Sequence, residues 1–257
     1  MARLSATFTA MSLRMTTHAE ILIPENIPPD ENEPLKVLYL LHGLTGGCTD
    51  WLDKTRIAYY AQQQRFIVVM PEVQNSFYTD MAFGGSYFTY IAHELPSLVE
   101  QFINVKHTRA RTYIAGLSMG GYGAAKVALT RPEFFTACAA FSGALHAEGL
   151  FKQMPEMDEW HKKLAMGIAG TELKVPEGGC LFQLAGALAD KPVKPRVLVT
   201  CGDKDFLLEA NRAFDAHMKA LPFEYAYREW PGDHDWDFWE QSLPVMFDFF
   251  NKEGDFA

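Results

Sequence analysis

Short apolar runs alternate with amphipathic stretches, and this alternation limits the fold more than any other feature of the chain. Five runs of four to seven residues are largely apolar: 37–41 (VLYLL), 66–70 (FIVVM), 112–115 (TYIA), 135–141 (FTACAAF) and 197–201 (VLVTC). Such runs are typical of strands buried on both faces of a parallel sheet. The stretches between them predict helices at 54–65, 87–102, 120–130 and 207–221, with a closing helix at 236–252. This alternation predicts an α/β fold with a mostly parallel central sheet and helices on both faces.

Three other segments complete the expected organisation. Residues 5–23 show partial apolar alternation and predict an N-terminal antiparallel hairpin, and residues 223–229 predict a last strand. The segment 143–194 is a long insert between two strands, and its apolar residues predict helices. These helices would either form a partial cap over a site or decorate the edge of the fold. At 257 residues and 48% hydrophobic side chains, the chain is expected to form one domain, 1–257.

Composition excludes several classes of function. A net charge of −9 with no long Lys/Arg run argues against nucleic-acid binding, which needs a basic surface. No stretch approaches the roughly 18 apolar residues of a membrane span, and the first residues lack the apolar core of a signal peptide. We therefore expect a cytoplasmic protein that does not associate with membranes. The four cysteines form no C-x-x-C pair, so no metal site is expected.

Ser118 is the candidate nucleophile. It lies in Gly116-Leu117-Ser118-Met119-Gly120, a G-x-S-x-G match with an apolar strand before it and a helix of small residues after it. This is the strand–turn–helix context of a nucleophile elbow, in which a sharp turn exposes the serine hydroxyl. The motif and its context predict the α/β-hydrolase fold.

A serine hydroxyl needs a base and an orienting acid, which follow in the order Ser, Asp or Glu, His in this fold. His234 is the only histidine in the last forty residues, and it lies in a turn before the closing helix. Asp203 and Asp205 both follow the run 197–201, and we expect Asp205 to be the acid. Asp233 and Asp235 flank the histidine, and one of them is expected to cap the closing helix.

The oxyanion that forms during acyl transfer needs preorganised N–H donors. One is expected to be the backbone N–H of Met119, directly after the candidate nucleophile. The other is expected to come from the glycine-containing loop 42–47, which follows the first apolar run, and we nominate the N–H of Leu44.

These segments resemble the esterase D family, and within it the bacterial tributyrin-esterase branch. The matching segments span most of the chain in order: LYLLHGLTG (38–46), Asp50-Trp51, FIVVMP (66–71), YTD (78–80), HELP (93–96), YIAGLSMGGYGAAKVAL (113–129), FSGAL (141–145), CGDKDFLLEAN (201–211) and GDHDWDFW (232–239). Together they are far more specific than the serine motif alone.

The resemblance implies a cofactor-free serine carboxylesterase that hydrolyses short acyl esters, from acetyl to butyryl. It also implies a homo-oligomer, a dimer or a tetramer, and a substrate pocket near Trp51, Tyr78, Phe83 and Trp236. Three alternatives remain: a thioesterase of the S-formylglutathione hydrolase type, an acyltransferase on the same scaffold, and a binding protein that has kept the fold without catalysis. The loop GLTGGCTDW (43–51) departs from the thioesterase branch.

Overall fold

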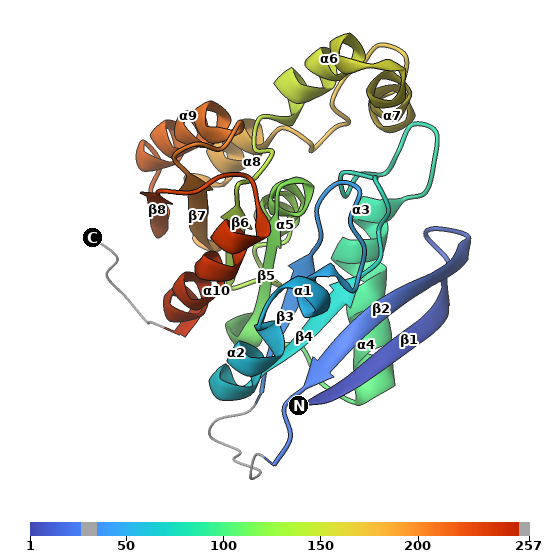
Figure 1. Ribbon diagram of the computed structural model, residues 1–257, viewed down its shortest axis with the longest axis vertical. Helices are drawn as coiled ribbons and strands as arrows, with labels where there is room; N and C mark the ends of the chain where they lie inside the picture. The colour runs from blue at the N-terminus through green and yellow to red at the C-terminus, as the bar shows by residue number, and fades with distance from the viewer. Residues whose placement is uncertain (27–34, 252–257) are drawn as a thin grey trace.

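One eight-stranded sheet forms the centre of the protein (Figure 1). The computed structural model describes residues 1–26 and 35–251. The strand order is β1-β2-β4-β3-β5-β6-β7-β8, in which β1, β2 and β4 pair antiparallel and all other neighbours pair parallel. The strands are β1 (Ala2–Ala10), β2 (Met15–Ile23), β3 (Lys36–Leu41), β4 (Phe66–Pro71), β5 (Thr112–Leu117), β6 (Ala137–Phe141), β7 (Arg196–Gly202) and β8 (Tyr225–Trp230).

The α/β-hydrolase fold expected from the sequence is confirmed. The N-terminal hairpin is present as β1 and β2, and it extends the parallel part of the sheet through β4. Each apolar run forms a strand within a few residues of the expected limits. The predicted end of the closing helix, Lys252, lies outside the described residues.

Side chains of the central strands alternate between two apolar cores, one on each face of the sheet. In β3, Val37, Tyr39 and Leu41 enter one core, whereas Leu38 and Leu40 enter the other. This is the period of two that an extended strand imposes. All five are at most 2% exposed, which explains why the run contains no polar residue.

Helices cover both faces (Figure 1). One core is closed by α1 (Asp50–Lys54), α2 (Ile57–Gln64) and α10 (Trp236–Asn251). The other is closed by α3 (Tyr87–Thr89), a π-helical turn (Tyr90–Glu94), α4 (Leu95–Ile103), α5 (Met119–Thr130) and α9 (Leu208–Lys219), together with parts of the insert. The longest helix of the described residues, α10, has 16 residues, and no helix in this part of the chain is long and apolar enough to span a bilayer.

Two predicted helices differ from the structure. The stretch 54–65 is broken at Thr55, which is extended, and the Thr55 hydroxyl accepts the N–H of Ile57 at the start of α2. The stretch 87–102 contains the wider π-helical turn. The insert 143–194 forms α6 (Ala147–Met157), α7 (Glu159–Ala169) and α8 (Leu181–Leu188), and α6 packs against α7 at one end of the molecule (Figure 1).

Candidate active site

Ser118 occupies a sharp turn between β5 and α5. Its backbone has φ +53° and ψ −117°, a conformation that non-glycine residues rarely adopt. The turn is tight because β3 and α5 approach closely, and a Cβ at Gly120 would lie 2.5 Å from the carbonyl oxygen of Leu41. The N–H of Ser118 donates to the carbonyl of Phe141 at 2.8 Å, which joins the turn to the end of β6. The local sequence therefore folds into the elbow that the motif predicts.

A continuous chain of hydrogen bonds leads from Ser118 to His234 and Asp205. The hydroxyl of Ser118 lies 3.0 Å from Nε2 of His234. On the other side of the ring, Nδ1 lies 3.0 Å and 2.9 Å from the two carboxylate oxygens of Asp205. Since a carboxylate only accepts hydrogen bonds, Nδ1 carries a proton, and Nε2 of the neutral ring is free to accept the serine proton. His234 follows β8 and Asp205 follows β7, so the parallel sheet brings three distant segments to one edge.

The two candidate acids have different partners. The Asp205 side chain is fully buried and contacts His234, whereas Asp203 is exposed and accepts the N–H of Gly232 at 3.2 Å. Burial by itself would raise the pKa of Asp205, but hydrogen bonds from the imidazole of His234 and from the N–H of Leu207 lower it below the ordinary value. Asp205 therefore stays ionised throughout the neutral range.

The acids beside His234 have structural partners. Asp235 accepts the N–H of Phe238 at 2.9 Å and so caps α10. Asp233 accepts the N–H of His234 itself at 2.8 Å. Both contacts fix the turn that carries the imidazole.

The loop 42–47 lies directly beside Ser118. A Cβ at Gly43 would lie 2.5 Å from Cδ1 of Leu117 and 3.5 Å from Cβ of Ser118, so a side chain at this position would displace the buried side chain of Leu117. The carbonyl of Gly43 accepts hydrogen bonds from Nδ1 of His42 at 2.8 Å and from the N–H of Gly46 at 3.2 Å. Because a trans peptide directs its C=O and N–H to opposite sides, these contacts hold the N–H of Leu44 in a fixed direction.

Both predicted oxyanion donors are available in the described structure. No group among residues 1–26 and 35–251 accepts a hydrogen bond from the N–H of Leu44. Met119 is the first residue of α5, where a helical N–H has no partner within its own helix. Leu44 and Ser118 line the same cavity.

This cavity has a volume of about 400 Å³ and contains both Ser118 and His234 in its wall. Its wall also includes residues 43–46 of the loop and the side chains of Trp236 and Trp239. Of the four predicted pocket residues, Trp236 is the one that lines it.

Trp51, Tyr78 and Phe83 lie outside the cavity wall, which corrects their predicted placement. Trp51 is fully buried, donates from Nε1 to the carbonyl of Leu41 at 3.1 Å and packs edge-on against Trp236. Tyr78 is fully buried beneath the loop 42–47. Phe83 is 67% exposed, and its N–H donates to Gly167 of α7. An aromatic residue can serve a core or a pocket equally well, so residue type did not separate these positions.

Phe206 is a site residue that was not predicted from the sequence. Its ring centroid lies 4.4 Å from that of His234, although the side chain is 74% exposed. An exposed aromatic ring against an imidazole in a cavity wall is placed to contact a ligand. The available signal was its position directly after Asp205.

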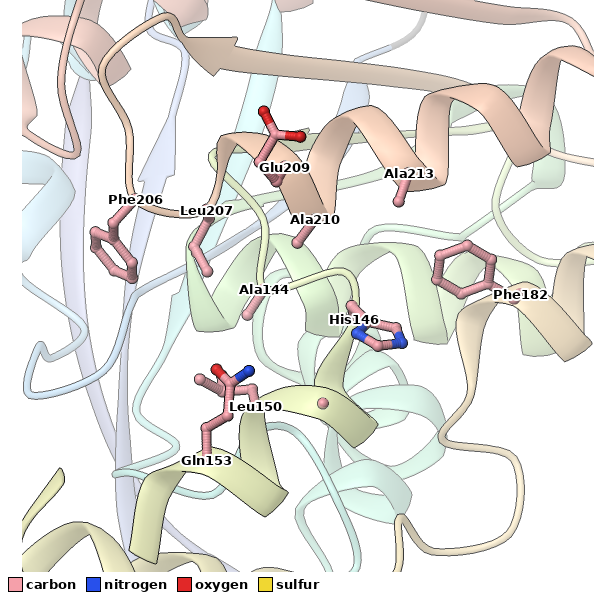
Figure 2. Close-up of a pocket in the computed structure, with 11 residues that line it drawn as sticks. Ala144, His146, Leu150, Gln153, Phe182, Phe206, Leu207, Glu209, Ala210 and Ala213 are labelled. Atoms are coloured by element: carbon pink, nitrogen blue, oxygen red, sulfur yellow. The ribbon is translucent and has the colours of Figure 1, made fainter. Parts of the chain in front are cut away.

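A second cavity of about 490 Å³ adjoins the first and shares Phe206 with it. Figure 2 shows it between α9 and the segment that includes α6, with Phe206 at one end and Phe182 at the other. Its wall is apolar at Ala144, Leu150 and Leu207 and polar at His146, Gln153 and Glu209. The insert thus contributes to a hollow beside the site.

Among the described residues, no cluster of three or more His, Cys, Asp or Glu side chains could hold a metal ion. Burial raises the pKa of Cys48 to about 11, so this thiol near the loop 42–47 stays protonated at neutral pH.

Several known proteins are similar to this chain in sequence, and two of them also in architecture. An acetyl esterase of Caldicellulosiruptor saccharolyticus is 29% identical over 99% of this chain and 100% of its own length. The fluorophosphonate-binding serine hydrolase F of Staphylococcus aureus, solved with substrate bound, is 30% identical and superposes with a TM-score of 0.87 over 98% of this chain and 99% of that one. An S-formylglutathione hydrolase of the same organism is 30% identical, with a TM-score of 0.83 over 97% and 98% of the two chains.

The fold and these similarities define the class of protein as an α/β-hydrolase. Within it, residues 10–250 match the model of the Esterase family, described as "Putative esterase", so the chain belongs to this family. It is a carboxylic ester hydrolase.

Proposed function

We propose that the protein is a serine esterase that hydrolyses short-chain acyl esters, with Ser118, His234 and Asp205 as its catalytic triad. The observation that carries this proposal is the unbroken chain of hydrogen bonds from the Ser118 hydroxyl through His234 to the buried Asp205 carboxylate. The free N–H groups of Leu44 and Met119 beside the same hydroxyl support it.

The proposed reaction has two acyl-transfer steps. Ser118 attacks the ester carbonyl while Nε2 of His234 takes its proton, and Asp205 stabilises the imidazolium that forms. The N–H groups of Leu44 and Met119 hold the oxyanion of the tetrahedral intermediate. The imidazolium then donates its proton to the leaving alcohol. Water, activated by the same imidazole, releases the acid from the acyl-serine.

The leaving group is assigned to the side of Phe206. His234 must protonate the leaving oxygen, so the alcohol departs past the imidazole, against which Phe206 packs. The second cavity begins at this ring and provides about 490 Å³ for the rest of the alcohol. The acyl group would then occupy the first cavity, where the indoles of Trp236 and Trp239 form part of the wall.

The proposed acyl range is acetyl to butyryl, in keeping with the tributyrin-esterase branch of the esterase D family. The acetyl esterase of C. saccharolyticus, which matches over nearly the whole chain, supports the short end of this range. A thioesterase of the S-formylglutathione hydrolase type is the second candidate, because the S-formylglutathione hydrolase of S. aureus superposes closely on this chain. Parallel assays of an acetyl oxygen ester and S-formylglutathione separate the two candidates.

Replacement of the nucleophile tests the proposal. Ser118→Ala is expected to lower turnover of 4-nitrophenyl acetate by at least about 10⁴-fold and to abolish labelling by a fluorophosphonate probe. Circular dichroism and thermal unfolding should show an intact fold. Wild-type-like turnover in this variant would refute the mechanism.

The proposed setting is a cytoplasmic homo-oligomer, a dimer or a tetramer, that acts on small-molecule esters without a cofactor. Size-exclusion chromatography with light scattering measures the oligomeric state.

A further inference from the structure

The segment between β4 and α3 has an unusual backbone where it packs beneath the loop 42–47. Gln74, Phe77 and Tyr78 have φ values of +53°, +50° and +49°, although none of them is glycine. Each such residue costs on the order of 1 kcal/mol or more, so the conformation persists only where surrounding contacts hold it. Phe77 and Tyr78 are also almost completely buried.

Lys126 of α5 forms hydrogen bonds with the segment between β4 and α3. Its ammonium group donates to the carbonyl of Tyr78 at 3.2 Å and to the hydroxyl of Thr79 at 3.0 Å, and it lies over the ring of Phe88. Lys126 is 3% exposed, and no carboxylate of the described residues lies within ion-pair distance of its ammonium group. Burial lowers its pKa to about 8, partly opposed by the charge of Asp80. Burying an ammonium group among mostly uncharged partners costs folding free energy. The contacts of Lys126 with Tyr78 and Thr79 therefore offset a substantial cost.

The ring of Tyr78 rests on α5, the helix that begins directly after Ser118. A Cβ at Gly123 would lie 2.4 Å from this ring, so the absence of a side chain there lets the ring pack on the helix backbone. From this position the Tyr78 hydroxyl donates to the carbonyl of His42 at 2.9 Å. The aromatic ring therefore connects the helix of the nucleophile to the loop that carries Leu44.

Contacts from the same segment fix the loop on both sides of the Leu44 N–H. The Tyr78 hydroxyl fixes the peptide unit that precedes Gly43, and the side-chain oxygen of Asn75 accepts the N–H of Thr45 at 2.8 Å. The N–H of Val73 donates to Nε2 of His42 at 3.2 Å, which orients the imidazole whose Nδ1 holds the Gly43 carbonyl. The direction of the Leu44 N–H thus depends on a segment that never touches the cavity.

We propose that Tyr78, held by Lys126, is a positioning residue that aims the N–H of Leu44 at the oxyanion. This inference rests on the proposed esterase mechanism. A donor that is poorly aimed weakens binding of the transition state and has little effect on binding of the ground state. Loss of the Tyr78 hydroxyl should therefore lower kcat and leave KM almost unchanged.

Tyr78→Phe tests the proposal, with Tyr122→Phe as a matched control. Tyr122 is also fully buried and donates to a backbone carbonyl, that of Gly179 at 2.8 Å. It shares the contacts with Lys126 and Thr79 but not the hydrogen bond to His42, so the comparison isolates that bond. Both variants should lose a similar amount of thermal stability, because each loses one comparable bond. We expect kcat for 4-nitrophenyl acetate to fall about tenfold or more in Tyr78→Phe, with KM within about twofold, and to stay within about twofold in Tyr122→Phe.

Inhibition by a trifluoromethyl ketone gives a second readout. Such a ketone forms a hemiketal oxyanion on the serine, so its Ki should rise in parallel with the loss of kcat in Tyr78→Phe. In Lys126→Met an apolar chain of similar length replaces the ammonium group, and this variant should also show a lower kcat and a higher Ki. If Lys126→Met does not fold, the result for Tyr78→Phe alone tests the positioning role.

Equal kcat and Ki in Tyr78→Phe and Tyr122→Phe would overturn the positioning role. Failure of the esterase mechanism itself would look different, because the wild-type protein would then neither react with a fluorophosphonate nor depend on Ser118 for turnover.

Discussion

Both carboxylate oxygens of Asp205 lie within 3.0 Å of Nδ1 of His234. This contact fixes the imidazole so that its other nitrogen faces Ser118. The neighbouring Asp203 points elsewhere and binds the backbone of Gly232. Two acids separated by one residue therefore have separable roles.

The first prediction concerns these two acids. Asp205→Asn should lower kcat for 4-nitrophenyl acetate by about 10³- to 10⁴-fold, because an amide neither fixes the required tautomer nor stabilises the imidazolium. Asp203→Asn should stay within about threefold of wild type. Steady-state kinetics of both variants at neutral pH measures the difference, and the reverse ranking would move the orienting role to Asp203.

The second prediction concerns Gly120, which lies two residues after the proposed nucleophile. Gly120→Ala should destabilise the fold by about 2–4 kcal/mol and displace the loop 42–47, since its Cβ would lie 2.5 Å and 2.7 Å from the carbonyl oxygens of Leu41 and His42. Gly186→Ala, in α8 with no atom within 4 Å of the added Cβ, should instead stabilise by about 0.5–1 kcal/mol. Urea unfolding measures both values, and a Gly120→Ala protein as stable as wild type would show that the approach of β3 and α5 can relax.

The third prediction concerns the ring between the two cavities. Phe206→Ala should join them, so that the ratio of kcat/KM for an acetate of a bulky alcohol to kcat/KM for ethyl acetate changes by about fivefold or more. Stability should change by no more than about 0.5 kcal/mol because the ring is exposed. Phe83→Ala removes an exposed ring outside both cavities and should leave the ratio unchanged. Equal ratios in both variants would remove Phe206 from the leaving-group side.

The fourth prediction concerns acid stability. The carboxylate of Glu72 accepts the N–H groups of Cys48 and Gln74 and lies 3.5 Å from Nε2 of His42. Partial burial alone would raise the pKa of Glu72, but the hydrogen bonds from the N–H groups of Cys48 and Gln74 help to hold it below the ordinary value. A depressed pKa contributes stability that is complete above the ordinary value near 4.5 and is lost as the pH falls toward 2.

Glu72→Gln should therefore be less stable than wild type at pH 7, by on the order of 2 kcal/mol after allowance for solvent screening, and the gap should narrow between about pH 5 and pH 2. Thermal unfolding across this range measures the gap. Glu156→Gln, an exposed position on α6, should follow the wild-type curve at every pH. A gap that stays constant with pH would show that the Glu72 charge does not stabilise the fold.

The features that could be predicted from the sequence are those that restrict the residue types at each position. Strands such as β3 and β4 are buried on both faces, so every residue must be apolar and the run is unmistakable. Ser118 could be placed because only small residues fit where β3, β5 and α5 meet. His234 and Asp205 could be placed because each follows a strand in the order that the fold requires.

Other features do not restrict residue type and could not be predicted. The positive φ values of Gln74, Phe77 and Tyr78 could not be predicted, because these residue types normally avoid that conformation and only tertiary contacts hold them there. Trp51 and Tyr78 were expected in the pocket and lie beneath it, since burial of an aromatic side chain in a core and exposure in a pocket select the same residues. Phe206 was not predicted because no sequence pattern distinguishes an exposed phenylalanine in a loop that lines a site from one that does not.

The insert 143–194 divides the residues of the proposed site between two halves of the chain. Ser118 and Leu44 precede the insert 143–194, whereas Asp205 and His234 follow it, and the halves meet where β6 pairs with β7. Neither half alone contains both the proposed nucleophile, Ser118, and the proposed base, His234. Cleavage of the chain between α7 and α8 would therefore give two individually inert fragments, and ester hydrolysis by their mixture would report reassembly of the sheet.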